Sequence, residues 1–157
     1  MEHLRLNLDH DGVFAESEVR DHQAGFDIRY VVRADAAWRT RAVEVARVDL
    51  HRVLRLRTDG EGHWEGHPEL DGCLDVDLRC TPFTNTLPIR RRPEGGAVRA
   101  AWIGLELEVQ PLEQVYTPLG ESRWHYRAAD FERELEVDEH GLVLDYPDGW
   151  RRVRERR

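Results

Sequence analysis

The sequence predicts an all-β fold in which many short strands are joined by turns. Two observations support this prediction. Apolar and polar residues alternate with a period of two along most of the chain, as they do in strands that are buried on one face. Turn signals recur between these segments, at Asp11-Gly12, at residues 59–62 and at Glu94-Gly95-Gly96. The 157 residues hold one sizeable core without linker or repeat, so we expect a single domain, residues 1–157.

The alternating segments can be placed along the whole chain. In residues 26–33, for example, Phe26, Ile28, Tyr30 and Val32 share one face. We expect strands over residues 4–8, 13–19, 26–33, 38–48, 51–58, a short one around 64, 73–80, 98–109, 113–116, 123–127, 131–137, 142–146 and 150–153. The segment 98–109 has the clearest apolar face and is expected to end before Pro111. No segment carries an apolar stripe with a helical repeat, so little helix is expected.

The stretch from Leu70 to Arg92 is the most informative part of the chain. Asp75 and Asp77 alternate with apolar residues, although aspartate is among the poorest strand formers. This strand face is either solvated and salt-bridged or the polar wall of a binding site. The following segment, 81–88, is bracketed by prolines, which are excluded from helix interiors and central strands. We therefore expect an irregular loop or short turn there, with Phe83 and Leu87 pointing inward.

Composition excludes several classes of function. The net charge of −8 argues against nucleic acid as a partner, because a phosphate backbone requires a basic surface. No apolar run of 18 residues and no secretory signal are present, so no transmembrane segment and a cytoplasmic location are expected. Cys73 and Cys80 lie about 23 Å apart on one extended strand, at ~3.3 Å per residue, so both are expected to be free thiols. The histidines lack metal-ligand spacing, and no cofactor motif is present, so neither metal nor cofactor is expected.

Several segments resemble those of one bacterial family. They are Trp38-Arg39-Thr40-Arg41, the block 70–91 with its Thr81-Pro82-Phe83-Thr84-Asn85-Thr86-Leu87-Pro88 core, and the tail 141–147 followed by Trp150-Arg151-Arg152. Together they are similar to the putative glycolipid-binding family, over roughly residues 26 to 153. The resemblance implies a spiral β-roll, an open, curled antiparallel sheet. It also implies a likeness to bacterial envelope lipoprotein carriers, which hold acyl chains in a hydrophobic cleft.

Residues and resemblance together predict non-catalytic binding of an amphipathic small molecule, such as a glycolipid, in the cleft of the roll. Aromatic rings would hold its apolar part, and arginine, aspartate and amide side chains would fix its polar head. Asp75 and Asp77 are expected to point into the interior of the roll and to pair with arginines, with Arg39 and Arg41 as the first candidates. The expected ligand-binding residues are Trp38, Arg39, Arg41, Asp75, Asp77, Thr84, Asn85, Arg90, Trp102, Tyr116 and Tyr126.

Two alternatives stay open at this point. One is a small enzyme that uses Asp75 or Asp77 as an acid–base residue in the same cleft. The other is a protein-interaction module with an exposed sheet edge. A carboxylate held in apolar surroundings favours the enzyme, whereas carboxylates that are all paired with arginines favour the carrier. The absence of a cleft favours the interaction module.

Overall fold

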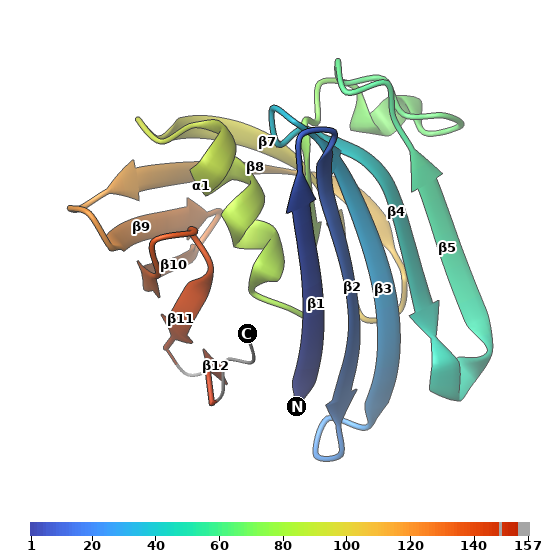
Figure 1. The fold of residues 1–157 in the computed structure, drawn as a ribbon. Helices are drawn as coiled ribbons and strands as arrows, with labels where there is room; N and C mark the ends of the chain where they lie inside the picture. The colour runs from blue at the N-terminus through green and yellow to red at the C-terminus, as the bar shows by residue number, and fades with distance from the viewer. Residues whose placement is uncertain (148, 154–157) are drawn as a thin grey trace.

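In the computed structural model of the protein, which describes residues 1–147 and 149–153, two β-sheets lie on either side of one short helical segment. Figure 1 shows the long N-terminal strands side by side, a second sheet that curls, and the helix α1 between the two sheets. The strands are β1 (Glu2–Asp9), β2 (Gly12–Asp21), β3 (Phe26–Asp35), β4 (Thr40–Arg47), β5 (Arg52–Arg57), β6 (Asp75–Leu78), β7 (Gly96–Ile103), β8 (Val109–Pro118), β9 (Arg123–Ala128), β10 (Phe131–Val137), β11 (Val143–Tyr146) and β12 (Trp150–Arg151). The helical elements are the 3-10 helices η1 (Val48–Leu50), η2 (Pro68–Leu70) and η3 (Phe83–Asn85), and the α-helix α1 (Thr86–Arg91). The mainly β fold with little helix that the sequence predicts is confirmed.

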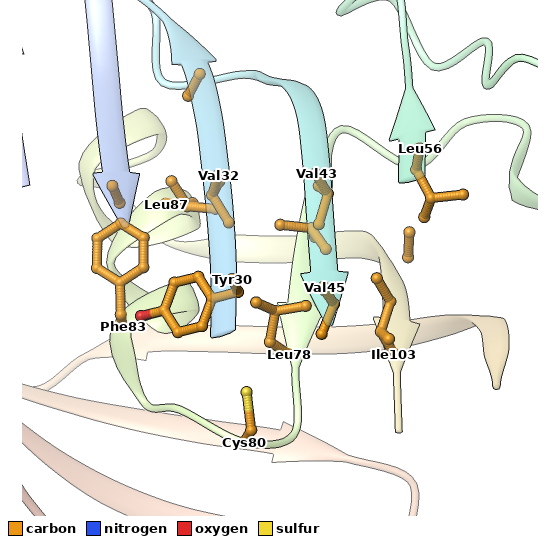
Figure 2. Close-up of a cluster of buried hydrophobic side chains, with 14 of the residues drawn as sticks. Tyr30, Val32, Val43, Val45, Leu56, Leu78, Cys80, Phe83, Leu87 and Ile103 are labelled. Atoms are coloured by element: carbon orange, nitrogen blue, oxygen red, sulfur yellow. The ribbon is translucent and has the colours of Figure 1, made fainter. Parts of the chain in front are cut away.

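The first sheet is an antiparallel meander in the order β1-β2-β3-β4-β5. Its alternating sequence places one side chain in two on the inner face, where Ile28, Tyr30 and Val32 of β3 are buried. In Figure 2, side chains of β3 and β4 meet Leu78 of β6 and Ile103 of β7. The apolar core therefore lies between the first sheet and the beginning of the second.

The second sheet has the order β12-β11-β10-β9-β8-β7-β6 and is antiparallel except for the parallel pair β6 and β7. Strand β6 also touches the first sheet, because the backbone N–H of Thr40 donates to the Leu74 carbonyl at 3.1 Å and Thr40 Oγ1 accepts from Val76 N at 3.2 Å. Val76 and Leu78 belong to the core between the sheets. Asp75 and Asp77 alternate with them and point to the other side, the concave face of the curled sheet.

The helical segment between the sheets corrects one sequence prediction. Residues 83–91 form η3 and α1 rather than an irregular loop or a short turn. Pro88 is compatible with this helix because it stands in the first turn, where backbone N–H groups have no intrahelical partner. Phe83 and Leu87 point inward as predicted, and both are buried (Figure 2).

The predicted strand 98–109 is wrong in its extent. It is two strands, β7 and β8, joined by a turn in which Leu107 N donates to the Gly104 carbonyl at 3.1 Å. Alternation continued through the turn because Leu105 and Leu107 pack on the same core as the strands. Strand β8 also continues through Pro111, which lies opposite Ala101 of β7. Strand β9 pairs only with the last four residues of β8, so no β9 residue lies opposite Pro111. The missing backbone N–H of Pro111 therefore breaks no hydrogen bond to β9.

Smaller differences concern the segments that flank the loops. The expected strand around Trp64 is a single bridge between Thr58 and Trp64. The expected strands 73–80 and 150–153 are shorter, since β6 and β12 span four and two residues. Cys73 and Cys80 are free, as predicted, and both are buried. No helix in the described part of the chain is long and apolar enough to cross a membrane.

Candidate functional site

The concave face of the curled sheet carries a polar network centred on Asp77. Its Oδ2 accepts a hydrogen bond from Gln114 Nε2 at 2.6 Å, and its Oδ1 lies 3.4 Å from the Thr84 hydroxyl that donates to it. Gln114 Nε2 also donates to the Tyr126 hydroxyl at 3.0 Å. Asn85 Nδ2 donates to the hydroxyl of Tyr116 at 2.8 Å. Strands β6, β8 and β9 and the helix η3 thus each contribute a polar group to one cluster.

Strand pairing explains why these side chains meet. Tyr116 of β8 lies directly opposite Tyr126 of β9, and their rings make an edge-to-face contact with centroids 5.1 Å apart. Gln114 precedes Tyr116 by two residues and therefore shares its face. The segment 83–85 crosses this face and brings Thr84 and Asn85 to the network.

Aromatic rings continue the network toward the surface. Tyr126 makes an edge-to-face contact with Phe131 at 6.0 Å between centroids, and Phe131 stacks on Tyr146 at 6.3 Å. Phe131 is 39% exposed, and Tyr146 is half-buried. The residues Asp77, Thr84, Asn85, Gln114, Tyr116, Tyr126, Phe131 and Tyr146 together form the Asp77 face. It leads from a half-buried carboxyl group to a solvent-exposed ring.

The two aspartates of β6 have different electrostatic environments. Asp75 forms a two-point ion pair with Arg91, with Nη2–Oδ2 at 2.5 Å and Nε–Oδ1 at 3.3 Å. Burial raises the pKa of Asp75, and Arg91 partly offsets this effect. Asp77 has no arginine partner among residues 1–147 and 149–153, and burial raises its pKa to about 6 despite the hydrogen bonds from Gln114 and Thr84. The prediction that Asp75 and Asp77 pair with Arg39 and Arg41 is wrong.

Of the remaining predicted residues, one shares the sheet face of Asp77 and four lie elsewhere. Trp102 is half-buried on β7 and pairs in register with Asp77, so it belongs to the same sheet face. Trp38 lies at the turn before β4, where the Arg90 guanidinium stands 5.0 Å from its ring centroid. Arg39 ties Asp35 to Glu61, with contacts at 3.0 and 2.6 Å. Arg41 lines a shallow surface depression of about 600 Å³ with Arg57 and His63. These last four positions are separate from the Asp77 face.

The chain is similar to proteins of one known family. A family model described as Putative glycolipid-binding matches residues 1–152. The chain belongs to this family. It is also similar to a DUF1089 family protein from Pseudomonas aeruginosa, whose crystal structure has a resolution of 1.80 Å. The two chains are 36% identical in sequence, and their structures superpose with a TM-score of 0.81. The match covers 97% of this chain and 92% of the Pseudomonas aeruginosa chain. No curated protein matches the chain.

In this member of the putative glycolipid-binding family, sequence reasoning missed several site residues. Gln114 shares the inward face of β8 with Leu112 and Tyr116. A polar residue at an inward position of a strand could have indicated a site residue. Phe131 and Tyr146 meet only because β10 and β11 pair, and neither carries a local motif. The family match also begins at residue 1, so it includes the N-terminal strand that the quoted motifs leave out.

The two thiols are unsuited to nucleophilic chemistry. Burial raises the pKa of Cys73 to about 11 and raises that of Cys80 further. Because the thiolate is the reactive form, neither cysteine is a nucleophile near neutral pH. The Asp9-His10-Asp11 group at the β1–β2 turn brings three potential metal ligands together, but Asp9 Oδ1 is used by the backbone N–H groups of Asp11 and Gly12. The Asp77 face is therefore the candidate site.

Proposed function

We propose that the protein binds a small amphipathic molecule with a hydroxyl-bearing head, such as a glycolipid, on the Asp77 face and without chemical change. The observation that carries the proposal is the contact between a carboxyl group that lacks a cationic partner and a run of tyrosine and phenylalanine rings. Carboxyl and amide groups bind hydroxyl groups, and aromatic rings cover the apolar face of a sugar or the start of an alkyl chain. Family membership supports the same ligand class.

The ligand needs room, because η3 and α1 occupy the space between the sheets. We infer that the β11–β12 hairpin opens to admit the ligand. Its pairing is slight: β10 and β11 share two register pairs with an irregularity between them, and β11 and β12 share two. Such sparsely paired segments open at a lower free energy than the rest of a fold. Tyr146 would move with β11 and uncover Tyr126 and Phe131.

Titration with alkyl glucosides of graded chain length, from hexyl to dodecyl and below their micelle concentrations, tests the proposal. Each methylene that is buried contributes about 0.8 kcal/mol, so affinity should rise about fourfold per methylene until the site is full. Calorimetry measures the affinity, and amide chemical shifts locate the ligand on β8, β9 and β10. Absence of binding at every chain length, or shifts confined to other strands, would contradict the proposal.

In the described part of the chain, Asp77 is bound by neutral groups rather than by an arginine, so it does not show the arginine pairing that is expected for a carrier. It therefore also supports a second candidate, acid–base catalysis on the same ligand. A carboxyl group with a pKa of about 6 exchanges its proton near neutral pH, as a general acid or base must. Asp77→Asn separates the candidates, with Asp130→Asn on the exposed β9–β10 turn as the control. If the protein only binds its ligand, a bound glucoside keeps its mass in the wild type and in both variants. If the protein is an enzyme, it converts a bound probe into a product of different mass. Loss of this conversion in Asp77→Asn, but not in Asp130→Asn, would favour the enzyme.

A further inference from the structure

Arg133 lies at the outer end of the Asp77 face. It is the β10 residue directly opposite Tyr126, so both side chains project from the concave face. Its guanidinium carbon stands 4.5 Å from the ring centroid of Phe131. Arg133 is half-buried, in contrast to the exposed arginines on the convex side of the same strands, such as Arg127.

The guanidinium of Arg133 has unused hydrogen-bonding capacity. Its Nη1 donates to the Glu132 carbonyl at 2.8 Å. Its Nε is buried and has no hydrogen-bond partner among residues 1–147 and 149–153. The carboxylates of the adjacent residues, Glu132 and Glu134, project from the opposite face of β10, where they pair with His125 at 3.2 Å and with Arg123, respectively. The edge formed by Nε and Nη2 is thus left without a carboxylate in the described part of the chain.

This edge is the one with which arginine binds a carboxylate or a phosphate through two parallel hydrogen bonds. We propose that the ligand of the Asp77 face carries an anionic group, a carboxylate or a phosphate, which binds Nε and Nη2 of Arg133. The inference rests on the proposed function, because it places the charged end of the same ligand. The ligand's hydroxyl groups would then lie toward Asp77 and Gln114, and its charge would lie beyond Tyr126.

The unpaired N–H group of Arg133 favours an anion over a neutral group at this position. A buried N–H group without an acceptor is costly, and a charged acceptor compensates it better than a neutral one. The net charge of −8 repels an anionic ligand at long range, so binding of such a ligand depends on a local cation. Arg133 is such a cation, and it is held in place by Phe131.

Three probes with the same decyl chain and the same sugar ring test the inference: decyl glucoside, decyl glucuronide, which adds a carboxylate, and decyl glucoside 6-phosphate, which adds a phosphate. Calorimetry with the wild-type protein should show that one or both anions bind about tenfold or more tightly than the glucoside, since a charge-assisted hydrogen bond contributes roughly 1.5–3 kcal/mol. The relative affinities of the two anions tell a carboxylate ligand from a phosphate ligand. Equal affinities for all three probes would overturn the inference and leave the proposed function standing. Failure of all three to bind would overturn both.

Variants of Arg133 locate the effect. Arg133→Gln should weaken the anionic probe about tenfold or more and leave decyl glucoside within about twofold. Arg133→Lys, which keeps the charge and loses the planar edge, should fall between the two. Arg127→Gln removes an exposed arginine from the opposite face and should leave both affinities unchanged. If Arg127→Gln and Arg133→Gln weaken the anion equally, the effect is general electrostatics and the inference fails. Should Arg133→Gln not fold, the lysine variant and the wild-type comparison decide.

Discussion

Asp75 and Asp77 lie two residues apart on the same face of β6, and only Asp75 has an arginine partner. Arg91 of α1 meets Asp75 with two hydrogen bonds, and the side chains of Arg91 and Asp75 are 13% and 1% exposed, respectively. Asp77 is bound instead by the neutral groups of Gln114 and Thr84. The first aspartate therefore anchors the helix, and the second is left able to exchange a proton.

The anchoring role predicts that Asp75→Asn is strongly destabilising. The substitution leaves the buried Arg91 charge without its counter-ion, and loss of one partner of a buried pair costs about 3–5 kcal/mol. Urea unfolding measures the change in the free energy of unfolding. Glu94→Gln, which breaks the exposed pair with Arg92, is the control and should cost at most about 1 kcal/mol. Equal stabilities for the two variants would contradict the anchoring role.

The raised pKa of Asp77 predicts that the stability of the folded protein decreases as pH rises. Its pKa is raised by burial from 3.8 to about 6, so the folded protein binds this proton more tightly than the unfolded chain. The proton's contribution to stability is present below pH 3.8 and is lost as pH rises through about 6. With allowance for solvent screening, the loss is roughly 2 kcal/mol.

The measurement compares wild type with Asp77→Asn, which has no proton to lose. The stability of wild type relative to Asp77→Asn should fall between pH 4 and pH 7, whereas the difference between wild type and Asp130→Asn should stay constant over the same range. Carboxyl carbon chemical shifts report the titration directly. A midpoint near 4 for Asp77 would show that the carboxyl group is solvated in solution.

Alternation predicted strands well where one face meets the core and the other meets water, as in β2 and β3. It failed where apolar residues are buried for another reason. Leu105 and Leu107 belong to a turn, yet they pack on the core and continue the strand pattern. Helix α1 has six residues, too few to display a helical repeat.

The candidate site was predicted in part, for a similar reason. The aspartates of β6 stood out by their type, since aspartate is rare in strands. Their partners did not: Arg91 and Gln114 reach them only through the packing of α1 and the pairing of β7 and β8. Nothing near Arg39 or Arg91 in the sequence tells which arginine pairs with Asp75. Partners of this kind are fixed by tertiary structure.

The hydrogen bonds of another carboxylate, the half-buried Glu2, predict that β1 is held by hydroxyl groups. Glu2 accepts hydrogen bonds from Ser17, Tyr30 and Thr81 at 2.9, 2.7 and 2.9 Å. Glu2→Ala removes three hydrogen bonds, each contributing about 0.5–1.5 kcal/mol, so a loss of about 2–3 kcal/mol is expected. Asn7→Ala on the exposed face of the same strand is the control. Hydrogen exchange of the β1 amides should accelerate in Glu2→Ala alone, and equal exchange in both variants would refute the anchor.

The last prediction concerns the β11–β12 hairpin, whose opening the proposed binding mode requires. Arg152 donates to Asp138 at 2.9 Å and so ties the end of the hairpin to the turn after β10. The same carboxylate also accepts from the backbone N–H groups of His140 and Leu142, which shape the turn. Arg152→Gln removes the tie and keeps the turn, so the hairpin should open more often while the rest of the curled sheet is unaffected.

Hydrogen exchange and stopped-flow binding test this together. In Arg152→Gln, the amides of β11 should exchange several-fold faster, and those of β8 and β9 at the wild-type rate. If the ligand enters through the hairpin, the association rate of a decyl probe should rise by a similar factor, because a larger fraction of molecules is open. Arg151→Gln, the exposed neighbour, is the control and should change neither rate. Faster exchange without faster association would mean that the hairpin opens but does not gate the Asp77 face.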